Sequence, residues 1–584
     1  MICSKFRKVV NVHTEKIAIK CEEQSLTYMQ LDKKSDTIAS NLISMGIVAN
    51  DIVAIWMERS IEYVATILGI LKAGAAYLPL ELSLPESRIQ YIINDCKPKF
   101  IAISDKTELF TENVAVLKYD LISNVTKTRA KILESKSSDL SYVIYTSGSS
   151  GAPKGVMVEQ QSLFSLIDNS PIKSTDSDVW TLFHSFSFDF SVWEIFGALL
   201  TGATLVIVSD EYRKNPRKFL KLLQDECVTI LNQTPSAFYS LLSQFDDKPD
   251  NLSLRYVVFG GEQLNPARLK DWAEKHNDVS LVNMFGITET TVHVTVKALN
   301  NEDLISGTSN IGKPLPHMTI RLLDNELQPI ADNEVGEIFV GGAGVARGYI
   351  NNPKLTADRF ITAANGERLY RSGDLARYLS NGDLEYVGRL DTQVKLHGYR
   401  IELGEIETVM KRSGLVEEAV ALLKNLESGF HICAFYSTVF GEDTEERLRK
   451  HIDKNLPEYM RPMYYIKLDK FPVNENGKID RAALNVLAIG NTDKHPEPLE
   501  SDPLSAIIAL ITRGGIMTTD EINAASEFDR IGIDSISFIT MVVELEEHFG
   551  IEFEDDYLNY EKFETVGSFA EYVAERIRET QIIE

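Results

Sequence analysis

The chain has 584 residues, of which 44% are hydrophobic and 25% are charged, with 60 basic and 85 acidic side chains. This length predicts about three or four folding units, and the ordinary composition excludes a disordered or fibrous protein. The net charge of −25 argues against nucleic-acid binding, because phosphate contacts need clustered Lys and Arg. No segment approaches the ~20 consecutive apolar residues of a membrane-spanning helix. The start, residues 1–5, lacks the apolar core of a signal peptide, which indicates a cytoplasmic protein without a membrane partner.

Strand-like apolar runs alternate with helical patterns from about residue 17 to residue 390. Because short β runs separated by helices are typical of α/β layers, this part predicts an α/β fold with a substantially parallel sheet. The clearest predicted strands are 52–56, 142–145, 204–208 and 256–259, and the clearest predicted helices are 216–224 and 266–275.

A second region covers about residues 391–484, and a polar, proline-containing stretch without periodicity follows at 490–503. Such a stretch predicts a linker. Three helical patterns come after it, at 504–511, 535–549 and 563–577, and the second closes at Gly550, a good helix terminator. Together they predict a helical bundle of roughly 80 residues.

More than half of the surplus negative charge lies in this last part. Residues 501–584 contain 19 acidic and 5 basic side chains, a net charge of −14. Two interpretations are open at this point: a solvated acidic tail, or a separate small domain that meets basic partners.

The glycine-rich segment 145–155 follows a predicted strand directly. Glycine and small hydroxyl residues let backbone N–H groups approach a phosphate chain closely. The segment is not a Walker A loop, because Pro153 precedes Lys154 and Gly155 replaces the Ser or Thr that would hold magnesium.

Residues 146–155 strongly resemble the phosphate-loop signature of the adenylate-forming superfamily, which includes acyl-CoA synthetases and the adenylation domains of nonribosomal peptide synthetases. Other segments match in the order of that family, namely 71–80, 188–196, 283–289, 336–349, 370–375, 388–405 and 476–481. The versions at 71–80, 188–196 and 403–405 look like the amino-acid-activating branch. Residues 532–535, Gly-Ile-Asp-Ser, resemble the phosphopantetheine attachment site of a carrier domain.

The resemblance implies a large α/β N-terminal domain and a small, mobile α+β C-terminal subdomain, followed by an all-α carrier domain of the four-helix type. We therefore expect an adenylation core at 1–390, its C-terminal subdomain at 391–488, a linker at 489–503 and the carrier at 504–584. The implied reaction is ATP-dependent activation of an amino acid as aminoacyl-AMP, followed by transfer to a carrier thiol. The alternatives are an acyl- or aryl-CoA ligase with an incidental helical tail, and a nucleotide-binding or carrier-only protein without catalysis.

The resemblance also assigns the nucleotide site residue by residue. Asp374 matches the carboxylate that accepts both ribose hydroxyls, Glu289 matches the magnesium ligand, and Phe285 stands where the family usually has an adenine-stacking tyrosine. Lys478 matches the lysine that bridges the substrate carboxylate and the α-phosphate, Asp391 matches the hinge, and Lys395 follows on the segment implicated in thioester formation. The implied nucleotide-binding residues are Thr146, Ser147, Gly148, Ser149, Ser150, Gly151, Lys154, Asn283, Phe285, Gly286, Thr288, Asp374, Tyr386 and Arg389.

The substrate pocket can be carried over in the same way. Asp189 would pair with an α-ammonium, while Asn232 and His293 place hydrogen-bonding groups among apolar neighbours. The set resembles the threonine-type pocket of the family and predicts L-threonine, with serine, valine or a close analogue next; His293 can equally be a wall residue. The carried-over pocket residues are Asp189, Phe190, Trp193, Asn232, Val258, Gly260, Met284, Val292, His293 and Lys478.

The implied cofactors are ATP, Mg²⁺ and a 4′-phosphopantetheine arm on Ser535, attached by a phosphopantetheinyl transferase. Neither end leaves room for a condensation or thioesterase domain, which predicts transfer or tailoring by a downstream enzyme in trans. A small activator of the MbtH-like type is a further candidate partner. With this resemblance, the acidic residues 501–584 are interpreted as the surface that meets basic partner enzymes.

Overall fold

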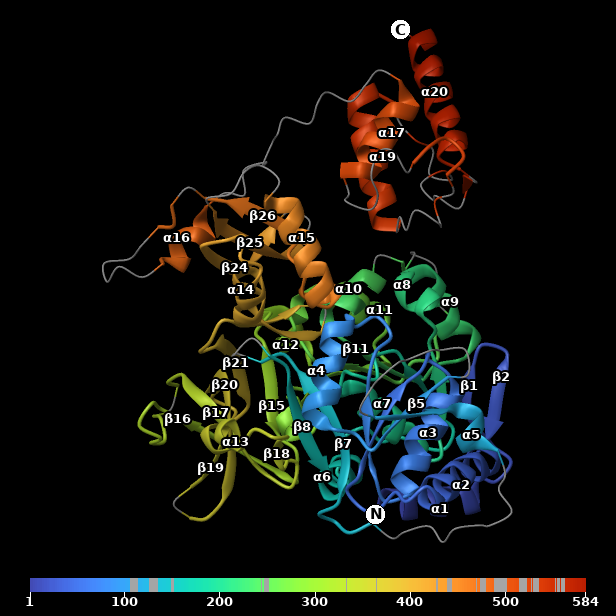
Figure 1. Cartoon of the computed structure of the whole chain (residues 1–584), viewed down its shortest axis with the longest axis vertical. Helices are drawn as coiled ribbons and strands as arrows, with labels where there is room; N and C mark the ends of the chain where they lie inside the picture. Colours follow the sequence, from blue (N-terminus) through green and yellow to red (C-terminus); the bar gives the residue numbers. More distant parts are fainter. Residues whose placement is uncertain are drawn as a thin grey trace. The chain divides into compact units, whose positions relative to one another are not determined.

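The structure, a computed structural model, divides the chain into two compact units, Met1–Asn485 and Val486–Glu584, and each is described by itself (Figure 1). The description covers all residues except 105–113, 125–134, 149–151, 243, 246–250, 332, 364, 397, 427–428, 439–443, 469, 473–478, 488–501, 514–521, 527, 529–534, 552, 554–556, 558–561, 564 and 584.

The first unit is built on two large β-sheets. The larger, 14-stranded sheet has a parallel centre in which β1, β10, β9, β11, β12 and β13 run side by side, and its flanks are antiparallel. Its strands are β1 (Ile17–Cys21), β2 (Gln24–Thr27), β9 (Val179–Leu182), β10 (Thr204–Ile207), β11 (Ile230–Gln233), β12 (Tyr256–Phe259), β13 (Ser280–Asn283), β14 (Thr295–Ala298), β15 (Asn310–Pro314), β16 (Met318–Leu323), β17 (Gly336–Gly342), β19 (Phe360–Thr362), β20 (Arg368–Tyr378) and β21 (Leu384–Arg389).

The second sheet has seven strands in the order β18-β8-β7-β4-β3-β5-β6, and the strands from β7 to β6 pair in parallel. Its strands are β3 (Ile52–Trp56), β4 (Ala76–Pro79), β5 (Phe100–Ile103), β6 (Ala115–Lys118), β7 (Leu140–Thr146), β8 (Lys154–Glu159) and β18 (Gly348–Tyr349). The predicted α/β class with parallel sheet is thus confirmed, and the predicted strands at 52–56 and 256–259 coincide with β3 and β12.

Helices alternate with the strands of these two sheets along the chain. Helix α7 is largely apolar and all of its residues are buried, Glu194 included, as expected of a helix in the middle of a core. It approaches β9 so closely that a Cβ added to Gly197 would lie 2.6 Å from Cη2 of Trp180, so only glycine fits there. The helices up to residue 390 are α1 (Ile2–Val12), α2 (Tyr28–Ser44), α3 (Ile61–Lys72), α4 (Glu86–Cys96), α5 (Tyr119–Ser123), α6 (Gln160–Asp168), α7 (Phe190–Leu199), α8 (Asp210–Lys214), α9 (Pro216–Asp225), α10 (Pro235–Leu242), α11 (Lys270–Lys275), α12 (Asn301–Ser306) and α13 (Pro353–Arg359), with 3-10 turns η1 (Pro266–Leu269) and η2 (Thr288–Thr290).

One predicted helix, 266–275, is divided in the structure into η1 and α11. The side chain of Asn265 accepts a hydrogen bond from the backbone of Ala267 at 3.2 Å. This side chain caps the 3-10 turn, and the α-helix begins one turn later, at Lys270.

The remainder of the first unit, residues 391–485, is called the small subdomain. It begins with a hairpin, β22 (Gln393–Leu396) and β23 (Tyr399–Glu402), which leads directly into α14 (Leu403–Arg412). A three-stranded sheet and short helices follow: β24 (Glu418–Leu426), β25 (Gly429–Ser437), β26 (Tyr464–Lys467), α15 (Thr444–Asn455), η3 (Glu458–Met460) and α16 (Arg481–Val486).

The second unit contains α17 (Pro503–Arg513), α19 (Ser535–Phe549) and α20 (Val566–Ile583). Helix α19 has the predicted bounds, and Gly550 after it has φ 65, the left-handed conformation that ends a helix. The predicted helix 563–577 begins later, at Val566, because the side chains of Thr565 and Ser568 cap it reciprocally at 3.1 and 3.2 Å. Aliphatic and aromatic side chains form the core of this unit, in which the ring centroids of Phe538 and Phe569 lie 4.9 Å apart.

Within the described ranges, no helix is both long and apolar enough to cross a membrane. These ranges also contain no group of three or more His, Cys, Asp or Glu side chains that could hold a metal ion.

Candidate active site

The glycine-rich segment forms the turn between β7 and β8. Strand β7 ends at Thr146 and β8 begins at Lys154, and the two residues face each other in the register of the hairpin. Ser147 is buried, and a side chain on Gly148 would collide with the carbonyl of Ala152, so this tight turn requires glycine. Ser149, Ser150 and Gly151 lie outside the described residues.

Glu289 belongs to η2 and contacts Lys154, the residue that ends this turn. Its side chain is 0% exposed. Its Oε1 lies 3.0 Å from Nζ of Lys154 and accepts from the Tyr349 hydroxyl at 2.7 Å, while its Oε2 accepts from Nη1 of Arg400 at 2.7 Å. Burial alone would raise the pKa of Glu289, but Arg400 and Lys154 hold it well below its usual range. The carboxylate is therefore ionised and suits a divalent cation chemically, but only when Arg400 is withdrawn.

A second buried carboxylate, Asp374, lies on β20. Its Oδ1 accepts from Nη1 of Arg389 at 2.7 Å and from the Tyr386 hydroxyl at 3.2 Å. Its Oδ2 is buried and has no hydrogen-bond partner among the described residues. Because a buried carboxylate oxygen without a donor is costly, Asp374 is prepared to accept hydroxyl groups from a ligand.

Arg389 links this carboxylate to the predicted hinge. Its Nε and Nη2 donate to the two oxygens of Asp391 at 2.7 and 2.8 Å. Although burial would raise the pKa of Asp391, the guanidinium holds it below its ordinary value. Asp374, Arg389 and Asp391 therefore form one continuous ionic chain.

Three more residues of the predicted nucleotide site, Asn283, Phe285 and Gly286, line a small hollow together with Tyr386 and Lys395. Nζ of Lys395 lies 5.4 Å above the centroid of the Phe285 ring, and burial lowers the pKa of this lysine. The amide of Asn283 is already used, because it donates to the carbonyl of Asn310 at 2.8 Å. The hairpin β22–β23 thus brings a lysine to the nucleotide end, whereas Lys478 lies outside the described residues.

The substrate-pocket residues gather at one edge of the larger sheet. Strands β11, β12 and β13 are parallel, so their carboxyl ends meet, and the amino-terminal end of α7 faces them. Phe190 and Trp193 come from α7, which Asp189 directly precedes. Asn232 comes from β11, Val258 from β12, Gly260 and Met284 from the positions directly after β12 and β13, and Val292 and His293 from the segment before β14.

Asp189 directly precedes α7, makes no capping hydrogen bond to it and is 5% exposed. Its Oδ2 is buried without a partner in the described part of the chain. Burial raises the pKa of Asp189 to about 6, an effect only partly offset by the hydroxyl of Thr288. An ammonium group placed against it would restore the charged form.

Two further polar side chains, Asn232 and His293, have unpaired polar atoms and lie among aromatic rings. Nε1 of Trp193 donates to Oδ1 of Asn232 at 2.9 Å, whereas Nδ2 of Asn232 has no partner among the described residues. Both ring nitrogens of His293 are likewise buried and unpaired there, and burial lowers its pKa to about 3. The imidazole is therefore neutral and offers one donor and one acceptor. It stands edge-on to Phe190 and Trp193, at 5.1 Å from each, and a Cβ on Gly260 would press on it at 3.2 Å.

The backbone before His293 is unusual. Thr291 and Val292 both have the left-handed conformation, with φ 61 and 66, which is rare for β-branched residues and is found at functional sites. The hydroxyl of Thr291 holds the turn by donating to the carbonyl of Gly344 at 2.6 Å. Nothing in the local sequence signals this strain, because the turn contains neither glycine nor asparagine.

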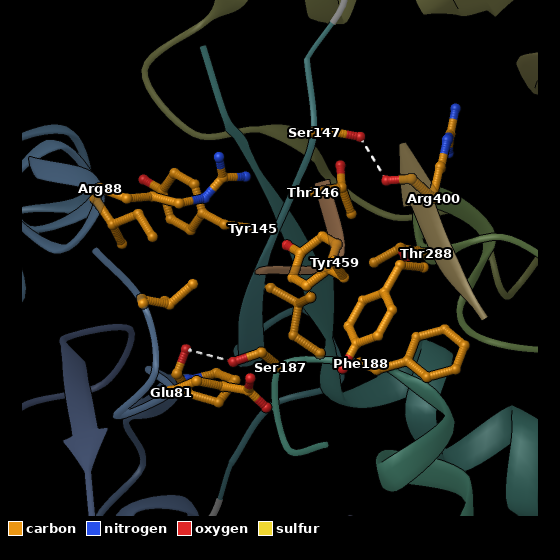
Figure 2. A pocket seen from close by; sticks show the side chains of 15 residues that line it. Glu81, Arg88, Tyr145, Thr146, Ser147, Ser187, Phe188, Thr288, Arg400 and Tyr459 are labelled. Atoms are coloured by element: carbon orange, nitrogen blue, oxygen red, sulfur yellow. Dashed lines mark hydrogen bonds between the residues drawn. The ribbon is translucent and has the colours of Figure 1, made fainter. Parts of the chain in front are cut away.

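Two cavities adjoin these groups. One of about 80 Å³ is lined by Thr146, Ser147, Phe188, Thr288 and Arg400, and Figure 2 shows the hydrogen bond from Ser147 to the carbonyl of Arg400 at its edge. The other, of about 590 Å³, also reaches Phe188 and is lined by residues of both the core and the small subdomain, including Arg59, His184, Tyr399 and Glu458.

Sequence reasoning missed three side chains that complete this centre: Tyr349 and Arg400, which contact Glu289, and Glu405, whose Oε2 accepts from the Gly148 N–H at 3.3 Å. All three lie in matched segments, but no role could be assigned to them. The sequence feature that could have pointed to them is a charged or hydroxyl side chain within an otherwise apolar or glycine-rich segment. For Ser535, the structure describes only that α19 begins at this residue.

Comparison with known proteins agrees with this geometry. Residues 6–350 match the family described as AMP-binding enzyme, and residues 505–573 match the family described as phosphopantetheine attachment site. Among solved structures, PA1221, an NRPS protein containing adenylation and PCP domains, covers 98% of this chain and 96% of its own, with a TM-score of 0.79 and 23% identity. The artificially fused adenylation–PCP di-domain NpsA-ThdA from Klebsiella oxytoca covers 80% of this chain and 93% of its own, with a TM-score of 0.71 and 26% identity.

Two curated relatives illustrate the range of lengths. The dimodular nonribosomal peptide synthase of Bacillus subtilis is 38% identical over 94% of this chain, which spans 24% of that protein. Syringomycin synthase SyrB1 of Pseudomonas syringae is 37% identical over 82% of this chain, which spans 80% of that protein. The chain therefore covers less than a quarter of the first relative and most of the second.

Proposed function

We propose that this chain, which belongs to the nonribosomal peptide synthetase family of adenylation–carrier proteins, activates L-threonine with ATP and loads it onto its own carrier domain. The observation that carries the proposal is the set of unpaired buried groups at the sheet edge: Oδ2 of Asp189, Nδ2 of Asn232 and the imidazole of His293, taken within the described residues. An α-ammonium would pair with the carboxylate, and a side-chain hydroxyl would satisfy the other two groups.

In the first step, an oxygen of the amino-acid carboxylate attacks the α-phosphorus of ATP, the α–β bridging bond breaks, and pyrophosphate leaves. The chain positions the reactants and neutralises charge rather than reacting covalently. Oδ2 of Asp374 accepts the ribose hydroxyls, the ring of Phe285 lies against the adenine, and Lys478 bridges the carboxylate and the α-phosphate. Glu289 would hold Mg²⁺ once Arg400 has withdrawn, and the ion would supply positive charge beside the departing pyrophosphate.

In the second step, a thiol replaces AMP on the acyl carbon, so that a carbon–sulfur bond forms and the carbon–oxygen bond to phosphate breaks. A 4′-phosphopantetheine arm on Ser535 supplies the thiol when it is attached. Lys395 is the cation placed to balance the charge of the departing AMP, because its Nζ lies beside Phe285 at the nucleotide end. The cavity of about 590 Å³ reaches Phe188, the neighbour of Asp189, and would admit the arm to the activated carboxyl group.

The preference for threonine follows from the direction of each hydrogen bond. Oδ1 of Asn232 already accepts from Trp193, whereas Nδ2 is unpaired within the described residues, so the amide is placed to donate to the hydroxyl oxygen of the substrate. The neutral His293 accepts a hydrogen bond from that hydroxyl group with its unprotonated ring nitrogen. The methyl group meets the apolar side chains of Trp193 and Met284. Serine lacks that methyl group, and valine leaves both polar groups unpaired, which costs more.

The deciding experiment measures the intact mass of the full chain after incubation with a phosphopantetheinyl transferase, CoA, ATP and single amino acids. We expect an increment for the arm and a further threonine increment, larger in yield than with serine or valine. Ser535→Ala must abolish both increments. No arm on the wild type refutes the carrier assignment, and a preference for a large aromatic or charged amino acid refutes the pocket assignment.

We also propose the domain boundaries and the partners of the chain. We assign the core to 1–390, the subdomain that rotates at Asp391 to 391–488, the linker to 489–503 and the carrier to 504–584. The loaded threonine passes to a downstream condensation, transfer or tailoring enzyme, and an MbtH-like activator is a candidate partner of the core.

A further inference from the structure

Atoms of the small subdomain occupy the polar groups of the phosphate loop. The Ser147 hydroxyl donates to the carbonyl of Arg400 at 2.6 Å and accepts from the backbone N–H of Glu402 at 3.2 Å. The backbone N–H of Gly148 donates to Oε2 of Glu405 at 3.3 Å. Because these groups cannot also bind a triphosphate, ATP can enter the loop only after β23 and α14 have withdrawn.

The same displacement is required at Glu289. Arg400 comes from β23 and lies 2.7 Å from Oε2 of Glu289, while Lys154 of the core lies 3.0 Å from Oε1. With both oxygens held by protein cations, this carboxylate is not available to a metal ion that accompanies ATP. Two independent sets of contacts therefore require the small subdomain to leave before adenylation begins.

One ion pair crosses the surface that must separate. Arg88 lies on α4 of the core and Glu405 on α14, and Nη1 of Arg88 lies 2.7 Å from Oε1 of Glu405. Their side chains are 6% and 2% exposed. A pair contributed by two surfaces in this way is desolvated only while the surfaces touch, so it forms and breaks with docking. A hydrogen bond from Ser87 to the carbonyl of Lys454, at 3.1 Å, lies alongside.

We propose that Arg88 and Glu405 are positioning residues for the thioester-forming half-reaction, which hold the small subdomain against the phosphate loop and must separate before ATP binds. The inference rests on the proposed two-step function. If the pair only stabilised the fold, its loss would weaken both half-reactions. If it holds the small subdomain on the phosphate loop, its loss shifts the equilibrium towards the arrangement in which the subdomain has withdrawn. The ATP-binding arrangement gains population, and the arrangement that transfers the aminoacyl group loses it.

The test uses the full chain with its arm attached and the amino acid that the wild type activates best. The variants are Arg88→Gln, Glu405→Gln, their combination and the conservative Arg88→Lys. The matched control is Arg347→Gln, which removes a 2.8 Å ion pair with Glu159 that lies wholly within the core. Two quantities are measured: the KM for ATP in ATP–pyrophosphate exchange, and the single-turnover rate of aminoacyl transfer to the arm after pyrophosphatase treatment.

Each single Gln variant should lower the KM for ATP and slow transfer by about fivefold or more, the lower end of a typical conformational coupling. The combined variant should transfer no more slowly than the slower single variant, because one shared interaction is lost. Arg88→Lys should restore much of the transfer rate, and Arg347→Gln should not show the opposing changes.

Parallel weakening of exchange and transfer, additive losses in the combined variant, or no change in either quantity would each overturn the proposal. A wild-type protein that shows no amino-acid-dependent exchange would overturn the proposed function instead, before any variant is compared.

Discussion

Replacing Asp189 by asparagine should stabilise the protein while impairing its activity. The folded state holds the pKa of Asp189 at about 6, against an ordinary value of 3.8. Because the folded pKa lies above the unfolded one, the folded state binds the proton more tightly, and stability falls as the pH rises from about 4 to about 6. At pH 7 the full cost applies, and at 1.36 kcal/mol per pKa unit it amounts to about 3 kcal/mol.

Asp189→Asn has the same shape and removes this cost. We therefore expect the ligand-free variant to unfold at a higher urea concentration than the wild type at pH 7, and the difference to shrink as the pH falls towards 4. The matched control is Asp178→Asn. Asp178 is also buried, but burial is outweighed by Arg255, whose Nη1 lies 2.5 Å away and holds the pKa of Asp178 below its ordinary value, so its loss should destabilise.

The activity of Asp189→Asn should be lower than that of the wild type. Losing a buried charge pair with the substrate ammonium costs about 2 kcal/mol or more, which is roughly a 30-fold loss in kcat/KM for the amino acid in ATP–pyrophosphate exchange. In the wild type, kcat/KM should fall about tenfold per pH unit below about 6, because the protonated Asp189 cannot pair with an ammonium. An Asp189→Asn variant that is less stable than the wild type, or that keeps its exchange activity, would refute the reasoning.

Three further substitutions test separate parts of the site. Trp193→Phe removes the indole N–H that orients Asn232, so the preference for threonine over valine in kcat/KM should fall about tenfold; an unchanged ratio would contradict the orienting role. Asp374→Asn should raise the KM for ATP in exchange by about tenfold, since an amide nitrogen cannot accept from a ribose hydroxyl, and an unaltered KM would remove Asp374 from the nucleotide site. Gly398→Ala should slow aminoacyl transfer more than exchange, because Gly398 has φ 81 and a Cβ there would lie 2.7 Å from Cγ2 of Thr234; equal effects on both rates would argue against hairpin docking.

Much of the fold was predictable from local pattern. Strands such as β3 and β12 are continuous apolar runs, and α19 ends at Gly550 as its terminator predicts. The division of 266–275 into η1 and α11 was not predictable, because hydrophobic periodicity does not distinguish a 3-10 turn from the first turn of an α-helix.

The candidate site was predictable as a set of residue types but not as a network. The order of the motifs predicts that Glu289 and Asp374 belong to one site. It does not predict which basic side chains pair with these two carboxylates. Arg400 reaches Glu289 from 111 residues away in the sequence, and Arg88 reaches Glu405 across 317 residues. Such contacts depend on how the small subdomain rests on the core, which no local pattern determines.

The ionic chain through Arg389 has a mechanical consequence. One guanidinium donates both to Asp374, which we assign to the ribose, and to both oxygens of Asp391, the proposed pivot. Rotation at Asp391 must either break the two-pronged contact or pull Arg389 along and deprive Asp374 of its strongest donor. Rotation of the small subdomain therefore has one of two costs: the loss of the contact between Arg389 and Asp391, or a weaker contact between Arg389 and the carboxylate that we assign to the ribose.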